Sequence, residues 1–209
     1  MPGDDHLHET AATGFARAAS AYEVGRPGYP EAVGRLLRTE LGVGPGVTAV
    51  DVGAGTGRFT RLLASTGATV IAVEPVAAMR VAFQMALPEV PVCHGTAERL
   101  PFDGNSVDLV AAAQAFHWFE ARAALAEAHR VLRPGGGLLL VWNKRDDRVE
   151  WVRELEEVHV QLAGDVPRYT RAGVPWVGTI DASGGFGPVT HQTFENPVRV
   201  DIATFRSRE

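Results

Sequence analysis

The stretch T-A-V-D-V-G-A-G-T-G-R, residues 48–58, constrains the possible folds of this chain most strongly. A short apolar run leads into three glycines at alternate positions, Gly53, Gly55 and Gly57, and a helical pattern of apolar residues follows at once. This order predicts a strand, a tight turn and a helix. Glycine lets the backbone approach a ligand closely, and the first N–H groups of the helix point into the turn. We therefore expect a polar small molecule to bind there.

The glycine spacing alone does not identify that molecule. A dinucleotide-binding turn has a third glycine or alanine that lets the helix pack closely on the strand. Arg58 occupies that position here, and the pattern is G-x-G-x-G, preceded by the acid Asp51. Because glycine-rich turns are common, the neighbouring features must decide.

Composition indicates a single globular domain. The chain has 209 residues, of which 45% are hydrophobic and 22% charged. A net charge of −5 argues against a nucleic-acid surface, and the single cysteine, Cys93, suits a reducing compartment. No apolar run reaches membrane-spanning length, and the first ten residues lack the pattern of a signal peptide. We expect a cytoplasmic protein with no membrane or nucleic-acid partner and no metal site.

The N-terminal region has a helix-like spacing of apolar residues over residues 9–22. An ordered loop, Y-E-V-G-R-P-G-Y-P, follows over residues 22–30, and a second helix is predicted to start near Pro30. Tyr22, Arg26 and Tyr29 in this region have two interpretations. They form either a surface cap held by ring packing or a lid over the ligand.

A second buried strand is predicted over residues 69–74, and it ends in Glu74. This acid lies 21 residues after Gly53, near the usual place of a carboxylate that accepts both hydroxyls of a ribose. The alternative is a solvated acid at the end of a strand. In the helix that follows, Met79 either flanks an adenine ring or belongs to the core.

Two further loops are predicted at the carboxyl ends of strands, where ligands bind in open α/β sheets. Residues 95–98 follow a third strand at residues 90–94, and the main chain at Thr96 and Ala97 could pair with an adenine edge. Q-A-F-H-W-F, residues 114–119, follows a fourth strand at residues 108–113. Two aromatic residues and a histidine in such a loop predict a pocket lined by Phe116, His117 and Trp118.

The remaining residues predict a helix over residues 121–132, ended by R-P-G-G-G, and a fifth strand over residues 138–142. A helix over residues 149–162, a loop or partial lid over residues 163–187 and a sixth strand over residues 189–194 follow. The alternation predicts an α/β, doubly wound, mostly parallel sheet with a Rossmann-like order. Its first change of direction lies between the first and fourth strands, where the candidate site residues converge.

Four motifs in this order resemble class I S-adenosylmethionine-dependent methyltransferases, and more narrowly the branch called methyltransferase type 11 or UbiE-like. They are V-D-V-G-A-G-T-G, Glu74 at the second strand end, G-T-A-E-R-L-P-F, and V-L-R-P-G-G-G-L-L-L. The resemblance covers roughly residues 10 to 145. It implies S-adenosylmethionine as cofactor, with Asp51, Gly53 and Gly55 near its amino-acid part and Glu74 on its ribose. It further implies Ala97 and Glu98 near adenine, Gln114 near the methionine end, and Tyr22 and Arg26 closing over the cofactor.

The predicted cofactor-binding set is Tyr22, Arg26, Asp51, Gly53, Ala54, Gly55, Gly57, Glu74, Pro75, Met79, Thr96, Ala97, Glu98 and Gln114. Within one methyltransferase domain we expect N-terminal cap helices over residues 1–46 and a cofactor-binding core over residues 47–145. The C-terminal helix, loop and last strand occupy residues 146–209. Members of that branch usually continue through another helix to a final antiparallel strand. Either residues 198–205 supply a shortened last strand here, or the edge of the sheet is left open.

The expected reaction is transfer of a methyl group to an unidentified small molecule by in-line displacement. His117 is a candidate general base if the nucleophile bears a proton; otherwise it lines the pocket or has a structural role. Tyr22, Phe116 and Trp118 are candidates for a cation–π contact with the sulfonium. The alternatives are a nucleotide-cofactor (NAD-type) oxidoreductase and a cofactor-binding protein without catalysis. The sequence leaves open whether the protein is a monomer or a homodimer.

Overall fold

A computed structural model of the chain describes residues 27–163 and 176–198. In this part of the chain, one parallel sheet has five strands in the order β3-β2-β1-β4-β5. Their bounds are β1 Thr48–Val52, β2 Thr69–Val73, β3 Val92–Cys93, β4 Val107–Ala113 and β5 Leu132–Val141. The chain moves outward from β1 to β3 and then crosses to the other side of β1 for β4. The predicted change of direction between the first and fourth strands is therefore confirmed.

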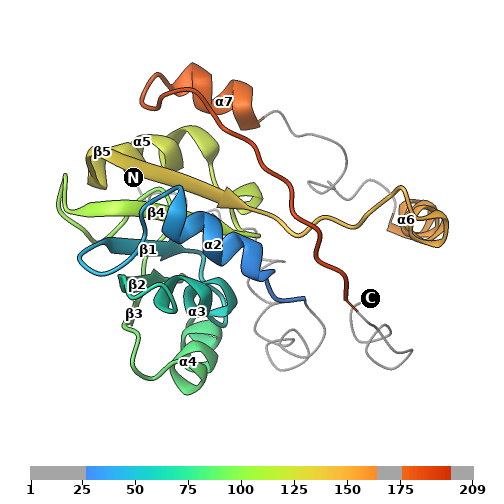
Figure 1. Cartoon of the computed structure of the whole chain (residues 1–209), viewed down its shortest axis with the longest axis horizontal. Coiled ribbons are helices and arrows are strands. Elements are labelled where there is room, and N and C mark those ends of the chain that lie inside the picture. The colour runs from blue at the N-terminus through green and yellow to red at the C-terminus, as the bar shows by residue number, and fades with distance from the viewer. Residues whose placement is uncertain (1–26, 164–175, 199–209) are drawn as a thin grey trace, which may run out of the picture.

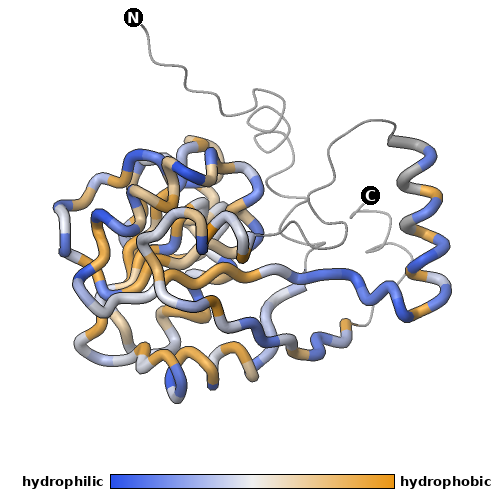
Figure 2. Tube along the Cα trace, turned by 90° about the horizontal axis from the view of Figure 1, so that it is seen from above, coloured by the Kyte–Doolittle hydropathy of each residue, from blue (hydrophilic) through white to orange (hydrophobic). Residues whose placement is uncertain are grey.

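Helices cover both faces of the sheet (Figure 1). One face carries α2 (Glu31–Thr39), α3 (Arg58–Ala64) and α4 (Ala77–Ala86), and the other carries α5 (Ala121–Val131) and α7 (Trp176–Ser183). A short 3-10 helix, η1 (Phe116–Trp118), follows β4. The helix α6 (Glu150–Ala163) stands apart from the sheet, at the end of a polar segment that begins at Lys144 (Figure 2).

Two cores lie between the sheet and its helices because successive side chains of a strand point to opposite faces. Val50 and Val52 of β1 pack in the core beneath α5 and α7, whereas Ala49 packs in the core with α2, α3 and α4. The side chains of β4 are divided between the same two cores. Burial on both faces explains why the strands read as continuous apolar runs rather than alternating ones.

β5 begins earlier than the sequence predicts. The run R-P-G-G-G was expected to separate a helix from a strand starting at residue 138, but β5 starts at Leu132, directly after α5. The register shifts from Val107↔Leu132 to Leu109↔Gly137, so the run forms a bulge against β4. A Cβ on Gly136 would lie 2.9 Å from the carbonyl oxygen of Asp108, so the close approach of the two chains requires glycine there.

The predicted sixth strand over residues 189–194 is wrong. No strand pairing is present in residues 184–198, which cross the end of β5 instead of lying along it (Figure 1). Phe186 packs against the core beneath α5 and α7, whereas Phe194 packs against the core on the opposite face. A segment that passes from one face to the other cannot form a ladder with β5, which is the edge of the sheet in the described part of the chain.

The predicted loop over residues 163–187 contains α7, which packs on α5. Several other predictions lie outside the described residues, namely the helix over residues 9–22, the cap residues Tyr22 and Arg26, and most of the segment 198–205. No helix in residues 27–163 and 176–198 is long and apolar enough to cross a membrane.

Candidate cofactor and acceptor site

The glycine turn connects β1 to α3 at the carboxyl edge of the sheet. The N–H groups of Gly53 and Ala54 both donate to the carbonyl oxygen of Val73, at 2.8 and 3.2 Å, and so fasten the turn to β2. Gly53 has a φ of 69°, and a Cβ there would lie 2.7 Å from the Cβ of Ala115. Gly55 has a φ of 57°, but a Cβ there would meet nothing within 4 Å. Gly53 thus serves packing, whereas Gly55 faces open space where a ligand can approach.

Glu74 lies directly beside this turn. Its Oε2 accepts a 2.9 Å hydrogen bond from the N–H of Gly55, and its Oε1 accepts one of 2.9 Å from the N–H of Val76. The side chain is 5% exposed, so the alternative of a solvated acid is wrong. Burial raises the pKa of this carboxyl, while the two N–H donors and the charge of Arg80 oppose the rise. Arg80 also holds the loop, because its Nη1 donates to the carbonyl oxygens of Glu74 and Pro75.

Asp51 is a second buried acid, on β1 immediately before the turn. It is 1% exposed, and its Oδ2 accepts a 2.6 Å hydrogen bond from the hydroxyl of Thr60 on α3. Its Oδ1 is buried without a hydrogen-bond partner in the described part of the chain. Burial is the largest cause that raises the pKa of Asp51 to about 7, and the charge of Glu74 adds to the rise. The site therefore contains two neighbouring acids, one with an oxygen still able to accept.

Sequence reasoning did not identify Thr60, a polar residue in the helix that follows the glycine turn. In fact it is fully buried. The signal was present, since Thr60 precedes Leu63 by three positions and therefore lies on the same buried face of α3. A buried hydroxyl needs a partner, and Asp51 provides it.

The loop after β3 is placed near the turn but is more enclosed than expected. Ala97 is 6% exposed and its side chain packs in the core, so only its main chain is available to a ligand. Glu98 is half-buried, and its Oε1 accepts a hydrogen bond from the N–H of Glu120 at the start of α5. Thr96 forms an isolated bridge with Arg99. Met79 is 3% exposed, on the first turn of α4.

The aromatic loop after β4 divides into buried and exposed residues. Phe116 is 2% exposed, and its ring packs edge-on against Trp176 and Phe119, so Phe116 belongs to the core rather than to an open pocket wall. Trp118 is 39% exposed. His117 lies between them, with its ring 4.9 Å from that of Trp118. Trp142 and Trp176 lie parallel to each other at a ring separation of 6.4 Å.

The imidazole of His117 is held by Trp142 at the end of β5. The indole Nε1–H of Trp142 donates to Nδ1 of His117 at 3.4 Å. Because an indole nitrogen is only a donor, Nδ1 must be unprotonated, and the neutral ring carries its proton on Nε2. In this tautomer Nε2 donates a hydrogen bond and does not accept a proton. The predicted role of His117 as a general base would require the ring to leave this tautomer.

Gln114 marks the carboxyl end of β4 with a φ of 58°, which is uncommon for a residue other than glycine. Its N–H donates to Val141 and its side chain donates to the carbonyl oxygen of Asn143. Asn143, which the sequence analysis did not single out, also donates to the carbonyl oxygen of Gly28 and accepts from Asn196. This junction joins the entry of α2, the end of β5 and the C-terminal segment beside the candidate site.

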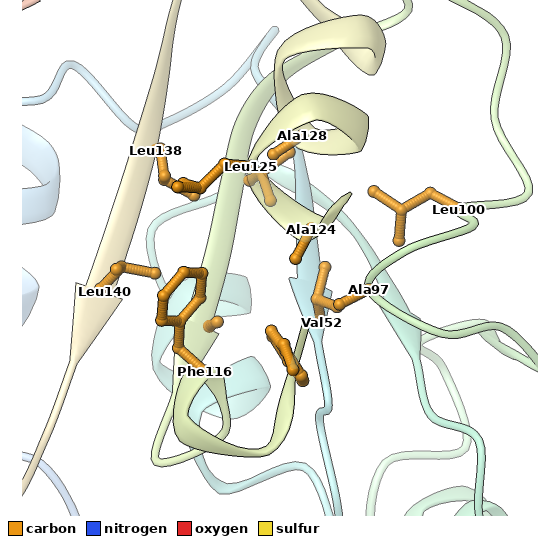
Figure 3. A pocket seen from close by; sticks show the side chains of 12 residues that line it. Val52, Ala97, Leu100, Phe116, Ala124, Leu125, Ala128, Leu138 and Leu140 are labelled. Carbon is orange, nitrogen blue, oxygen red and sulfur yellow. The ribbon is translucent and has the colours of Figure 1, made fainter. Parts of the chain in front are cut away.

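The space beneath the aromatic loop is a packing gap rather than a ligand site. It lies between the sheet and α5, has a volume of about 10 Å³, and is lined by apolar side chains such as Val52, Leu125 and Leu140 (Figure 3). That volume corresponds to about one water molecule, which would need polar partners to remain there. The candidate site is therefore the polar edge formed by the glycine turn, Asp51 and Glu74.

Comparison with known proteins places this fold in one class. A model of the methyltransferase domain matches residues 50–140. An uncharacterized methyltransferase of Mycobacterium tuberculosis is 48% identical over 145 residues, which are 69% of this chain and 58% of that protein. An uncharacterized methyltransferase-like protein of Schizosaccharomyces pombe is 35% identical over 182 residues, which are 86% of this chain and 70% of that protein.

A solved structure shows the same fold. The SAM-dependent methyltransferase of Thermotoga maritima matches with a TM-score of 0.54 and 24% identity, over 86% of this chain and 79% of that chain. The architecture is thus that of the class I methyltransferases. This chain belongs to the methyltransferase family. It spans 58% of the length of its mycobacterial relative.

Proposed function

We propose that this protein is an S-adenosylmethionine-dependent methyltransferase that acts on a small molecule. The observation that carries the proposal is the buried carboxylate of Glu74, held on the N–H of Gly55 at the turn between β1 and α3. A carboxylate at the end of the second strand of such a sheet is placed to accept ribose hydroxyls. The unpartnered Oδ1 of Asp51 and the open space at Gly55 fit the remaining part of the same cofactor.

Each part of the cofactor has proposed contacts. The main chain of residues 53–57 and the carboxylate of Asp51 would hold the amino-acid part, and Glu74 would hold the ribose. The main chain at Thr96 and Ala97 would contact the adenine, with Pro75, Met79 and Glu98 around it. Gln114 would lie near the methionine end, and Tyr22 and Arg26 would close the site.

When bound, S-adenosylmethionine supplies an activated methyl group on a sulfonium, so the protein mainly has to align the acceptor. Alignment of the acceptor atom with the methyl group can supply several kcal/mol of the barrier, about 7 or more in favourable cases. The exposed ring of Trp118 provides an apolar surface for the acceptor. The ring of His117 lies 4.9 Å from that of Trp118, beside this surface, and its tautomer favours a hydrogen-bonding role over that of a base.

Calorimetric titration with S-adenosylhomocysteine, the demethylated cofactor, and with NAD tests the proposal. We expect S-adenosylhomocysteine to bind the wild-type protein and NAD to give no heat of binding. Binding of NAD instead would support the oxidoreductase alternative. A folded protein that binds neither compound would contradict both. Once binding is established, a screen of metabolites with a radiolabelled methyl donor would identify the acceptor.

A further inference from the structure

Thr60 lies under the candidate site, in contact with Asp51, and has no role in the proposed function. Thr60 is fully buried on α3, and its hydroxyl donates to Oδ2 of Asp51 at 2.6 Å. A valine of similar shape would pack there without requiring a polar partner. The hydroxyl therefore serves the carboxyl group of Asp51, and their hydrogen bond fixes the orientation of that group.

The free oxygen of the same carboxylate indicates a ligand of defined chemistry. Oδ1 of Asp51 is buried and has no hydrogen-bond partner in the described residues, and a buried acceptor without a partner is unfavourable. Glu74 lies close enough for its charge to act on Asp51. Two adjacent acids, one with an unused oxygen, favour a cation that donates hydrogen bonds. A primary ammonium group fits both requirements.

We infer that Thr60 is a positioning residue, which fixes the carboxylate of Asp51 so that Oδ1 receives the ammonium of the cofactor's amino-acid part. The inference rests on the proposed function, because it takes the cofactor from there. It adds a residue outside the glycine turn whose effect should be confined to one part of the ligand. Thr60 touches only Asp51 in this role, whereas Glu74 serves the ribose.

Two ligands distinguish a positioning role from a merely structural one. S-adenosylhomocysteine has the amino-acid part, whereas 5′-methylthioadenosine has the same adenine, ribose and thioether but lacks the ammonium and the carboxylate. In the Thr60→Val variant we expect the affinity for S-adenosylhomocysteine to fall about tenfold, as for loss of one charge-assisted interaction. The affinity for 5′-methylthioadenosine should stay within about twofold, the usual precision of such a comparison.

Two variants serve as controls. Thr60→Ser keeps the hydroxyl and should bind S-adenosylhomocysteine nearly as well as the wild type. Thr66 follows α3, and its buried hydroxyl donates to the carbonyl oxygen of Leu63. Thr66→Val removes this hydroxyl and should change the affinity for neither ligand. If Thr60→Val does not fold, as judged by circular dichroism, Thr60→Ala removes the same hydroxyl and should weaken the binding of S-adenosylhomocysteine only.

The outcomes separate the inference from the proposed function. If Thr60→Val loses affinity equally for both ligands, or for neither, the positioning role is overturned while the proposed function stands. A wild-type protein that binds neither ligand would overturn the proposed function and the inference with it. Selective loss of S-adenosylhomocysteine, rescued by Thr60→Ser, would establish the role.

Discussion

The N–H of Gly55 donates a 2.9 Å hydrogen bond to Oε2 of Glu74, and this bond joins the turn after β1 to the end of β2. The two residues are 19 positions apart in the sequence. Because β1 and β2 are paired up to Val52 and Val73, the turn and the acid emerge side by side. The sheet itself therefore places the acid beside the glycine turn, with a geometry that does not depend on a ligand.

Removal of this acid should disable cofactor binding. In Glu74→Ala, the N–H groups of Gly55 and Val76 lose their acceptors and the ribose loses its carboxylate. We expect the affinity for S-adenosylhomocysteine to fall about 100-fold, because the ribose loses its hydrogen bonds to a charged group. Isothermal titration calorimetry measures this change. Glu89→Ala, at an exposed acid after α4, is the matched control and should bind normally. Unchanged affinity in Glu74→Ala would refute the ribose role.

The two glycines of the turn should respond differently to alanine. Gly53→Ala combines a left-handed φ with a Cβ 2.7 Å from that of Ala115, so it should lower the free energy of unfolding by about 2–4 kcal/mol. Gly55→Ala meets open space and should cost about 1–2 kcal/mol for its backbone alone. However, its methyl group occupies the space of the ligand, so cofactor affinity should fall. Urea unfolding and calorimetry separate the two effects, and equal stability losses would contradict this interpretation.

Asp51 should make stability depend on pH. Its carboxyl keeps a proton up to about pH 7 in the folded protein but loses it near 3.8, the ordinary value, when unfolded. Between these values the folded state holds more protons, so the free energy of unfolding falls as pH rises, by at most about 1.4 kcal/mol per pH unit. The contribution of Asp51 to the free energy of unfolding is complete below pH 3.8 and is lost above about pH 7.

The comparison with Asp51→Asn isolates this contribution, because asparagine does not titrate. Denaturant unfolding of both proteins from pH 5 to 8 should show the variant gaining stability relative to the wild type as pH rises. A difference that stays constant over this range would mean that Asp51 is already ionised at pH 5. The charge of Glu74 contributes to the expected shift, so Glu74→Gln should move the transition of Asp51 to lower pH.

The tautomer of His117 should depend on Trp142. Nitrogen-15 NMR of the imidazole in the wild-type protein should show the proton on Nε2, because Nδ1 accepts from the indole at 3.4 Å. Trp142→Phe keeps an aromatic ring but removes the N–H, and a mixture of tautomers should result. Trp151→Phe, at an exposed residue of α6, should leave the spectrum of His117 unchanged. A proton on Nδ1 in the wild type would restore the general-base prediction.

Sequence patterns predicted the sheet well because they reflect local physics. Buried parallel strands give continuous apolar runs, and the glycines of residues 53–57 mark a turn with positive φ angles, which are uncommon for residues other than glycine. The same reasoning placed Glu74 correctly, since a strand end fixes an acid in space. The site predictions for Gly53, Gly55 and Glu74 thus rest on geometry that neighbouring residues determine.

Other features depend on contacts between distant segments. The apolar residues at 189–194 looked like a strand, but their course is set by α7 at one end and by Asn196 at the other. The bulge at residues 133–136 is created by the approach of β4, which local spacing does not indicate. Likewise, the partner of Thr60 and the indole beside His117 come from other elements, so their roles appear only when the chain is folded.

The bond from Asn196 to the carbonyl oxygen of Gly28 spans 168 positions of the chain, and this separation bears on how the protein folds. Closing so long a loop costs chain entropy before any contact compensates for it. Residues 184–198 should therefore dock after the rate-limiting step of folding, on a sheet that has already formed. Loss of the hydrogen bond between Asn196 and Gly28 should therefore speed unfolding and leave the refolding rate nearly unchanged.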